Sequence, residues 1–495
     1  MIRLRLPLAI AHRVLIDFFR DRRSRVVLIV TPGILIILGR YMYSSPAAFD
    51  RTGGLMLGVF PALSMFLTGS TALVHERGEG TLEKVLTTPA SRKDLVAGYV
   101  IAAAVASLAQ AAVTVTLAYE VCQLTTQTPA WLIYLLTALC GIFGMSLGIC
   151  ASAVSKNEGE AEMFLPGAMV PQLLLCGVFW PVSRMDTWVH WLADFLPITA
   201  LANTMTAARL HFYGGISMVY SLIAMAGIIV ISLTVAVRVV GTRAVTDLSF
   251  RTSIPRGNEM FSPAIEIRDL VVHRGGRPII NGVSVSVEVG AITGLLGPSG
   301  SGKTTLMRCI MGVQRIRSGE VIVLGRPAGT APLRREVGYL SQPPSAYAEL
   351  TVEENVRHFA ALYGYGKKEA GAAIDDAGLA DLRKQYVRTL SSGQRTRAAL
   401  ACALVGRPRV LILDEPTVGQ DPVLRRELWQ QFRCLADSGV TILISSHVME
   451  EAARCDRILL IRGGTVIAHD APDLIQAAAG AEGLEEAFVS LVEAD

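Results

Sequence analysis

The sequence predicts two domains of different fold class: an all-α polytopic membrane domain with six transmembrane helices, followed by an α/β domain with a phosphate-binding loop. Three observations carry this prediction. Long apolar runs dominate residues 1–240, strand-like and helix-like stretches alternate over residues 263–495, and a glycine-rich loop follows one of these strands. The polar stretch 241–262, with Gly, Ser and Pro, is expected to be a linker between the two domains.

The composition supports a membrane protein and excludes several other classes. Of the 495 residues, 51% are hydrophobic and 18% are charged, whereas average globular chains have about 25% charged residues. The net charge of +4 is too small to indicate a nucleic-acid partner. The eight cysteines do not have the spacing of a disulfide framework or a zinc site, so we expect reduced, structural cysteines.

Six segments are apolar enough to cross a lipid bilayer, which takes about 20 residues. They are residues 26–43, 54–74, 95–119, 131–154, 163–181 and 217–240. Lys and Arg are frequent before the first segment and after the second, and sparse in the alternate loops. The positive-inside rule therefore predicts a multi-pass protein of the cytoplasmic (inner) membrane with both termini in the cytoplasm.

Two amphipathic segments accompany these spans. Residues 12–23 have a basic face and an apolar face, which favours an interfacial elbow helix over a simple extension of the first span. The loop before the last span contains Trp188 and Trp191, and we expect a re-entrant or interfacial helix pair there, with His190 as a membrane-belt residue rather than a site. Ionisable residues are scarce within the spans, which argues against a proton-driven carrier.

The strongest chemical signal is the loop GPSGSGKT, which lies between an apolar strand, AITGLLG, and a helix-like stretch. Glycines in such a loop let backbone N–H groups turn toward a nucleotide phosphate. Lys303 is expected to contact the β- and γ-phosphates, and the Thr304 hydroxyl to bind Mg²⁺. The expected nucleotide-binding residues of this loop are Gly297, Pro298, Ser299, Gly300, Ser301, Gly302, Lys303, Thr304 and Thr305.

Two further apolar strands end in polar residues. VLILDE, residues 410–415, is uninterrupted, which is typical of a strand buried on both faces of a parallel sheet, and ligands bind at the carboxyl ends of such strands. We expect Asp414 to bind Mg²⁺ and Glu415 to polarise an attacking water. The alternative is that both acids serve only to bind Mg²⁺. TILISSH ends in His447, which is expected to contact the γ-phosphate.

A second anion site is predicted at LSSGQ, residues 390–394. This stretch precedes a clear helix, RTRAALACAL, and the N-terminus of a helix attracts anions. Ser391 and the N–H groups near Gly393 would line this second site, which is separate from the phosphate loop.

The order of these motifs, with a glutamine after VGYLS and with VGQD after VLILDEPT, resembles the nucleotide-binding domain of an ABC transporter. The resemblance covers residues from about 265 onward and implies an α/β P-loop ATPase domain of the ABC type that hydrolyses ATP with Mg²⁺. It also implies that two such domains enclose two ATP molecules, each phosphate loop facing the LSSGQ helix of the other domain. Gln342 would then contact Mg²⁺ and the membrane domain, and Asp421 would lie in the loop that crosses the dimer interface. The residues implied for the second ATP contact are Ser391, Ser392, Gly393 and Gln394.

The sequence departs from the family pattern at two positions. Ser392 replaces a glycine of the usual LSGGQ, but the serine and the second glycine are present, so we expect an active ATPase. Where the family often stacks adenine on a tyrosine, this chain has Arg274, next to His273. The planar guanidinium of Arg274 is able to stack on a base, and the sequence does not decide between the two residues.

The first half resembles the membrane domain of type-2 ABC exporters. The resemblance rests on the six spans, the elbow, the inner loop HERGEGTLEKVLTTPASRKDL and the amphipathic loop before the last span. GLEEAFVSLVE near the C-terminus is similar to the tail of drug-export ATPases. The inner loop is expected to be the coupling element, to which the ATPase domain transmits its conformational change. The alternative is an ordinary charged loop.

Together these resemblances imply a half-transporter. The expected function is ATP-driven export of a small amphipathic substrate (a drug, an antibiotic or a lipid-like molecule) by a two-fold homodimer. Three alternatives stay open: a lipid or glycan flippase or exporter, a heterodimer with a homologue, and an ABC regulator that does not transport.

Overall fold

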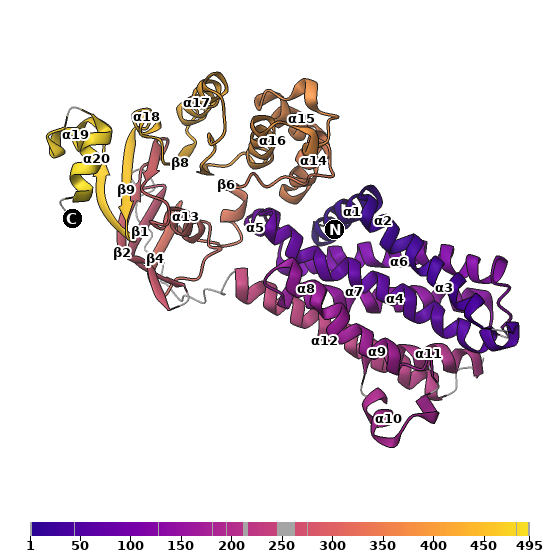
Figure 1. The fold of residues 1–495 in the computed structure, drawn as a ribbon. Coiled ribbons are helices and arrows are strands. Elements are labelled where there is room, and N and C mark those ends of the chain that lie inside the picture. The colour runs from indigo at the N-terminus through magenta and orange to yellow at the C-terminus, as the bar shows by residue number, and fades with distance from the viewer. Residues whose placement is uncertain are drawn as a thin grey trace. The chain divides into compact units, whose positions relative to one another are not determined.

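The computed structural model describes residues 2–493 except 44, 127, 181, 195, 211–215, 245–262, 275 and 482. The chain forms two compact units, which Figure 1 shows as a helical part and a part with strands. The first unit comprises Met1–Gly78 and Arg92–Val240, and the second comprises Glu79–Ser91 and Gly241–Asp495. The short stretch Glu79–Ser91 therefore lies between two helices of the first unit in sequence but packs with the second unit.

The first unit is helical wherever the structure describes regular elements in it. Its elements are α1 (Ile2–Arg20), α2 (Arg22–Arg25), η1 (Val26–Val30), α3 (Thr31–Met42), α4 (Pro46–Gly78), α6 (Arg92–Glu120), α7 (Ala130–Val154), α8 (Glu158–Phe164), η2 (Leu165–Met169), α9 (Val170–Leu175), η3 (Val182–Arg184), α10 (Thr187–Asp194), α11 (Pro197–Leu210) and α12 (Ile216–Ala244). Among the described residues, five helices are long and apolar enough to cross a membrane. They are Arg22–Met42, Phe49–Gly78, Arg92–Glu120, Ala130–Val154 and Met218–Val240.

Five of the six expected spans thus coincide with helices that are able to cross a membrane, and the span expected at 163–181 is not one of them. Its residues form α8, η2 and α9, and the helix ends at Leu175. Pro166 and Pro171 lie in this stretch. Proline has no backbone N–H and its ring crowds the preceding turn, so it interrupts the α-helical hydrogen-bond ladder. The π-helical turn η2 is the local consequence of this interruption.

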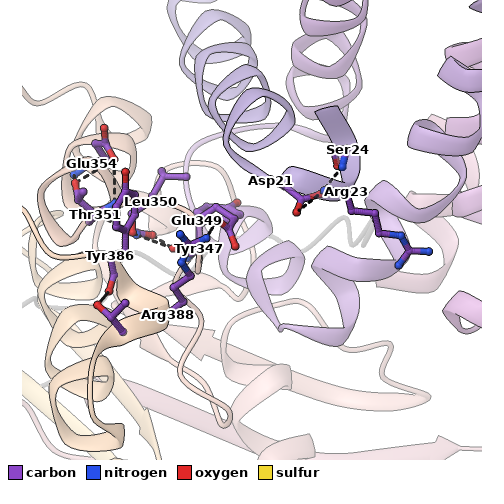
Figure 2. A network of polar contacts seen from close by, with 12 residues as sticks. Asp21, Arg23, Ser24, Tyr347, Glu349, Leu350, Thr351, Glu354, Tyr386 and Arg388 are labelled. Carbon is purple, nitrogen blue, oxygen red and sulfur yellow. Dashed lines mark hydrogen bonds and ion pairs between the residues drawn. The ribbon is translucent and has the colours of Figure 1, made fainter. Parts of the chain in front are cut away.

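The expected elbow segment is an α-helix separated from the first span. α1 ends at Arg20, and the Asp21 carboxylate accepts hydrogen bonds from the N–H groups of Arg23 and Ser24, at 3.3 and 2.7 Å, so α2 begins with its own cap (Figure 2). Arg13 of α1 forms a buried ion pair with Glu76 of α4. The Tyr99 hydroxyl of α6 donates to the same carboxylate at 2.7 Å. The elbow is thereby fixed to two spans by one buried polar cluster.

Residues before the last span form the expected pair of helices, α10 and α11. Trp188 and Trp191 of α10 are 70% and 66% exposed, as expected for residues of a membrane interface. α12 continues through Ala244. The remainder of the expected linker, 245–262, lies outside the described residues.

Close packing of α4 against α7 forms the centre of the first unit (Figure 1). A Cβ atom on Gly144 of α7 would lie 1.9 Å from the carbonyl oxygen of Ala62 on α4. One turn further along α7, a Cβ atom on Gly148 would lie 2.4 Å from the carbonyl oxygen of Phe66. Small residues let helix backbones approach closely in a membrane, where dispersion contacts replace the hydrophobic effect as the driving force.

The second unit contains two sheets. Its strands are β1 (Ile265–Arg274), β2 (Arg277–Val287), β3 (Ile292–Leu296), β4 (Ser318–Val323), β5 (Arg326–Pro327), β6 (Val337–Leu340), β7 (Val410–Asp414), β8 (Thr441–Ser446), β9 (Arg457–Arg462) and β10 (Thr465–Asp470). An antiparallel sheet has the order β2-β1-β4-β5, and a larger sheet has the order β10-β9-β3-β8-β7-β6. The strands from β9 to β6 in this larger sheet are parallel. Every residue of β7 is buried, which confirms the expectation for VLILD.

Helices cover these sheets. They are α5 (Thr81–Thr87), α13 (Lys303–Ile310), α14 (Val352–Tyr363), α15 (Lys367–Asp376), α16 (Ser392–Leu404), α17 (Pro422–Asp437), α18 (Met449–Ala452), α19 (Pro472–Ala479) and α20 (Leu484–Glu493). Leu306 and Ile310 of α13 belong to one hydrophobic core with residues of both sheets. The phosphate-loop helix therefore has a fixed position between the two sheets.

Candidate nucleotide site

The phosphate loop has the strand–loop–helix context that its sequence predicted, with β3 before it and α13 after it. Gly302 has a φ of 106°, and a Cβ atom there would lie 2.7 Å from Ile280 Cδ1 and 3.1 Å from the carbonyl oxygen of Ile279. A side chain is excluded at this position both by the backbone conformation and by β2. The loop is thus pressed against the β1–β2 hairpin.

Lys303 bends back over this loop. Its ammonium group donates hydrogen bonds to the carbonyl oxygens of Gly297 and Pro298, at 2.6 and 3.1 Å. Burial lowers the pKa of Lys303, and the nearby carboxylates of Glu415 and Asp414 act in the opposite direction. A phosphate beside the ammonium group would favour its charged form further. The buried Ser301 hydroxyl has no hydrogen-bond partner among the described residues, so the loop contains a polar atom that a ligand would satisfy.

The two acids after β7 are held by a serine of the neighbouring strand. β7 and β8 are parallel, with Asp414 in register with Ser445. The Ser445 hydroxyl donates to Asp414 Oδ1 at 2.7 Å and accepts from the Glu415 N–H at 2.9 Å. Ser445 is fully buried and Asp414 nearly so. One hydroxyl therefore fixes both the orientation of the first carboxylate and the backbone of the second residue.

Glu415 has a φ of 48°, a conformation that non-glycine residues rarely adopt. Residues held in such conformations cost roughly 1–3 kcal/mol and concentrate at functional sites. The Glu415 Oε1 atom lies 3.4 Å from His447 Nδ1. His447 is 53% exposed and Glu415 is 18% exposed, so this pair faces solvent at the carboxyl edge of the sheet. The structure brings Lys303, Asp414, Glu415 and His447 to this one edge.

The predicted second anion site lies at the start of α16. Ser391 and Gln394 form a reciprocal capping box, in which each side chain bonds the other residue's backbone N–H, at 3.2 and 3.1 Å. The Ser392 hydroxyl donates to the carbonyl oxygen of Gly419 at 3.4 Å. A Cβ atom on Gly393 would lie 2.4 Å from the Gln420 side-chain oxygen, so the two segments are in close contact here. This segment therefore packs on the loop that follows the two acids.

The remaining predicted residues occupy the borders of the site. Gln342 is exposed and follows β6, whose Leu340 pairs with Leu413 of β7. Asp421 accepts hydrogen bonds from the N–H groups of Val423 and Leu424, both at 3.0 Å, and so caps α17.

Arg274 is exposed at the end of β1, in the hairpin that packs on the phosphate loop through Ile279. The ring of His273 lies 3.0 Å from the guanidinium of Arg317.

Two buried residues with polar contacts escaped the sequence analysis. Ser445 was visible as a polar residue at the end of an apolar strand, but its role depends on the register between β7 and β8. Lys84 was counted only as a cation of the inner loop, although its side chain is 2% exposed. A lysine that is buried in a charged loop leaves no pattern in the sequence.

Replacing Ser445 with Ala is expected to lower ATP turnover about tenfold and to raise the Mg²⁺ concentration for half-maximal activity. The Asp414 carboxylate and the Glu415 N–H each lose a buried partner, which costs about 1–3 kcal/mol, and 1.4 kcal/mol corresponds to a factor of ten in rate. Steady-state ATPase assays over a Mg²⁺ series measure both quantities. Ser445→Thr keeps the hydroxyl and is the control. Unchanged turnover and Mg²⁺ dependence in Ser445→Ala would contradict this positioning role.

Comparisons with known proteins agree with this geometry. The family model described as ABC-2 type transporter matches residues 7–210, and the one described as ABC transporter matches residues 280–418. Nod factor export ATP-binding protein I of Rhizobium meliloti (strain 1021) is 37% identical over 237 residues, which cover 46% of this chain and 70% of that protein. The chain belongs to the ABC transporter family.

Another relative of this ABC transporter and a solved structure cover a similar share of the chain. The probable multidrug ABC transporter ATP-binding protein YbhF of Escherichia coli (strain K12) is 36% identical over 239 residues, covering 46% of this chain. The chain spans 41% of the length of that relative. The solved structure of the ATP-binding subunit of an ABC transporter has 28% identity and a TM-score of 0.44, and covers 46% of this chain and 99% of its own. The two family models identify the second unit as an ABC ATPase domain, which implies nucleotide binding, and the first unit as a membrane domain of the ABC-2 type.

Proposed function

We propose that this ABC transporter exports a small amphipathic substrate (a drug, an antibiotic or a lipid-like molecule) across the cytoplasmic membrane at the expense of ATP. The main support for the proposal is that four side chains lie at one edge of the sheet: Lys303, Asp414, Glu415 and His447. The described part of the same chain also has five candidate membrane spans. Relatives named for multidrug transport and for Nod factor export support the direction of transport.

We assign the roles at the site as follows. Glu415 would polarise the attacking water, and His447, whose ring lies 3.4 Å from the Glu415 carboxylate, would contact the γ-phosphate. Lys303 is already placed over the carbonyl oxygens of the phosphate loop and exchanges them for phosphate oxygens. The loop residues from Gly297 to Thr305 supply N–H groups to the phosphates.

The same residues fit a magnesium ion. Asp414 offers a nearly buried carboxylate that Ser445 orients, and Thr304 offers a partly exposed hydroxyl at the start of α13. Carboxylate and hydroxyl oxygens are the ligands that Mg²⁺ takes at nucleotide sites. The exposed Gln342 would offer a third oxygen. When bound, Mg²⁺ neutralises the negative charge that develops on the phosphates.

We further propose a two-fold homodimer as the working assembly. The helix α16 begins with Ser391, Ser392, Gly393 and Gln394, of which the two serines are exposed, and a helix N-terminus attracts anions. In a homodimer each of these termini would face the phosphate loop of the other copy, and Asp421 would lie near the junction. The loops rich in Lys and Arg support an orientation with both termini in the cytoplasm, where ATP is available.

ATP-driven uptake into inside-out membrane vesicles tests the proposal. We expect the wild-type protein to accumulate at least one compound from a panel of fluorescent amphipathic drugs and labelled lipids, and Glu415→Gln to accumulate none. A lipid as the only accumulated compound would identify a flippase. Absence of uptake for the whole panel, with ATPase activity intact, would contradict export and favour a regulatory role. Co-purification of a homologous chain would replace the homodimer with a heterodimer.

A further inference from the structure

The turn that carries His447 is closed by hydrogen bonds on both sides of that residue. β8 ends at Ser446, and α18 begins at Met449. The Val448 N–H donates to the Ser446 hydroxyl at 3.0 Å, so the residues before and after His447 are joined to each other. The Glu451 N–H donates to the Val448 carbonyl oxygen at 3.1 Å, which ties the turn to α18.

The Glu451 side chain completes this network. The Ser446 hydroxyl donates to Glu451 Oε2 at 2.7 Å, which leaves the lone pairs of that hydroxyl for the Val448 N–H. Ser446 is 5% exposed and Glu451 is 1% exposed, so water has little access to these groups. The backbone on both sides of His447 therefore has an orientation that depends on one buried carboxylate.

The helix that carries this carboxylate has a fixed position. Ala452, the residue after Glu451, is fully buried in a hydrophobic cluster with Leu296 of β3 and Ile458 of β9. Leu296 is the last residue of the strand that leads into the phosphate loop. Glu451 is thus anchored to the same sheet that positions the nucleotide site.

The second oxygen of Glu451 faces α17, the neighbour of α18 in Figure 1. Glu451 Oε1 lies 3.7 Å from Arg425 Nε. This distance is longer than an N–H···O hydrogen bond, which is usually about 2.7–3.2 Å, and neither atom has a hydrogen-bond partner in the part of the chain that the structure describes. Arg425 lies in the first turn of α17, which Asp421 caps. The guanidinium therefore compensates the charge of the carboxylate without fixing its direction, and Ser446 provides the directional contact.

Stability of the fold does not explain an acid at this position. Removing a charge from water is costly, and replacement of a buried ion pair by apolar residues of similar size is often neutral or stabilising. The adjacent Glu450 is exposed and does not have this cost. The contacts of Glu451 with the His447 turn give a functional reason for its burial.

We propose that Glu451 is a positioning residue for His447 in ATP hydrolysis. The inference rests on the proposed contact of His447 with the γ-phosphate. Glu451 itself lies behind the turn and holds Ser446 and Val448, which set the direction of the His447 ring toward Glu415, 3.4 Å away. Without the carboxylate the Ser446 hydroxyl rotates, the turn loosens and the ring samples more orientations. ATP binding persists, because the phosphate loop is unchanged, and the rate of hydrolysis falls.

Glu451→Met tests this role, because it keeps the length of the side chain and removes both acceptor oxygens. We expect kcat for ATP hydrolysis to fall about tenfold, the effect of about one lost hydrogen bond, with KM for ATP unchanged. Glu451→Gln keeps an acceptor oxygen for Ser446 and is expected to retain most of the turnover. Glu450→Met makes the same substitution on the adjacent exposed residue and is the matched control, with wild-type kcat and KM expected. Wild-type kcat in Glu451→Met, or a change in KM alone, would overturn the proposal.

A double variant with His447→Ala separates positioning from general damage to the fold. Two residues that act through one group have non-additive effects. Glu451→Met is therefore expected to cause no further loss of kcat once His447 is replaced. Single-turnover hydrolysis of radiolabelled ATP by the full chain in nanodiscs measures these low rates. A further tenfold loss in the double variant would mean that Glu451 acts independently of His447, and would overturn the proposal.

Ser446→Ala reaches the same network with a small change in volume, and it serves if Glu451→Met does not fold. It removes the donor to Glu451 and the acceptor of the Val448 N–H, so a similar loss of kcat with unchanged KM is expected. Size-exclusion chromatography and thermal unfolding check the fold of each variant. Wild-type kcat in Ser446→Ala would overturn the proposal.

The same measurements distinguish this inference from the proposed function. Wild-type turnover in His447→Ala would count against the proposed role of His447 at the γ-phosphate, and this inference would fall with it. Slow turnover in His447→Ala together with normal turnover in folded Glu451→Met would count against this inference alone.

Discussion

Replacement of Glu415 with Gln is expected to leave ATP bound and to lower ATP turnover by roughly 10²–10⁴-fold, the usual contribution of a positioned general base. The amide keeps the size of the side chain and its position near His447, but it does not accept a proton from water. The phosphate loop and Lys303 are unaffected, so affinity for ATP persists. Steady-state hydrolysis and retention of radiolabelled ATP on the purified protein measure the two effects separately.

Glu450→Gln is the matched control for this experiment. Glu450 is an exposed acid on α18, three residues after His447, and no part of the site depends on it. Its replacement is expected to leave turnover unchanged. Wild-type turnover in Glu415→Gln would remove Glu415 as the base, and the acidic pair would then serve only to bind Mg²⁺.

Replacement of Gly144 with Val is expected to prevent the membrane domain from folding. A Cβ atom would lie 1.9 Å from the carbonyl oxygen of Ala62, so α4 and α7 must move apart along their whole contact. Overpacking lowers the stability of the fold by about 1–3 kcal/mol when the neighbouring side chains are able to adjust, and by more when they are not. Here the clashing atom belongs to the backbone of α4, which does not adjust by a change of rotamer. Fluorescence-detected size-exclusion chromatography of a tagged protein measures the folded fraction, which is expected to disappear.

Gly227→Val is the control for this prediction. Gly227 lies within the α12 span, and no atom lies within 4 Å of the position that its Cβ would occupy. The added side chain meets open space, so the folded fraction is expected to stay near that of the wild type. A normal folded fraction in Gly144→Val would mean that α4 and α7 do not cross as closely as described.

The local chemistry of the nucleotide site could be predicted from the sequence, because each motif forms its own turn. GPSGSGKT specifies a loop by its glycines, and VLILDE specifies a buried strand that ends in acids. The bridge from Ser445 to both acids could not be predicted, because it depends on which strands are neighbours and in which register. Nothing in VLILDE or TILISSH alone indicates that Asp414 and Ser445 lie opposite each other.

Two features of the membrane half show different limits of sequence analysis. The expected span at 163–181 was inferred from the apolar composition of the segment. Composition alone does not show that Pro166 and Pro171 interrupt the α-helical hydrogen bonds. The sequence analysis identified the inner loop by its charged residues. Its helix α5 nevertheless buries Lys84 against residues more than 250 positions away in the sequence, and no local pattern predicts a contact at that separation.

The separation between Lys84 and Ala399, 315 residues, also constrains the biogenesis of the protein. At a synthesis rate of about 5–20 residues per second, α5 leaves the ribosome roughly 15–60 s before its partners on α16 exist. During that interval its apolar residues Leu82, Val85 and Leu86 have no ATPase domain to cover them. The membrane helices therefore have time to insert before the contacts of α5 with the ATPase domain form.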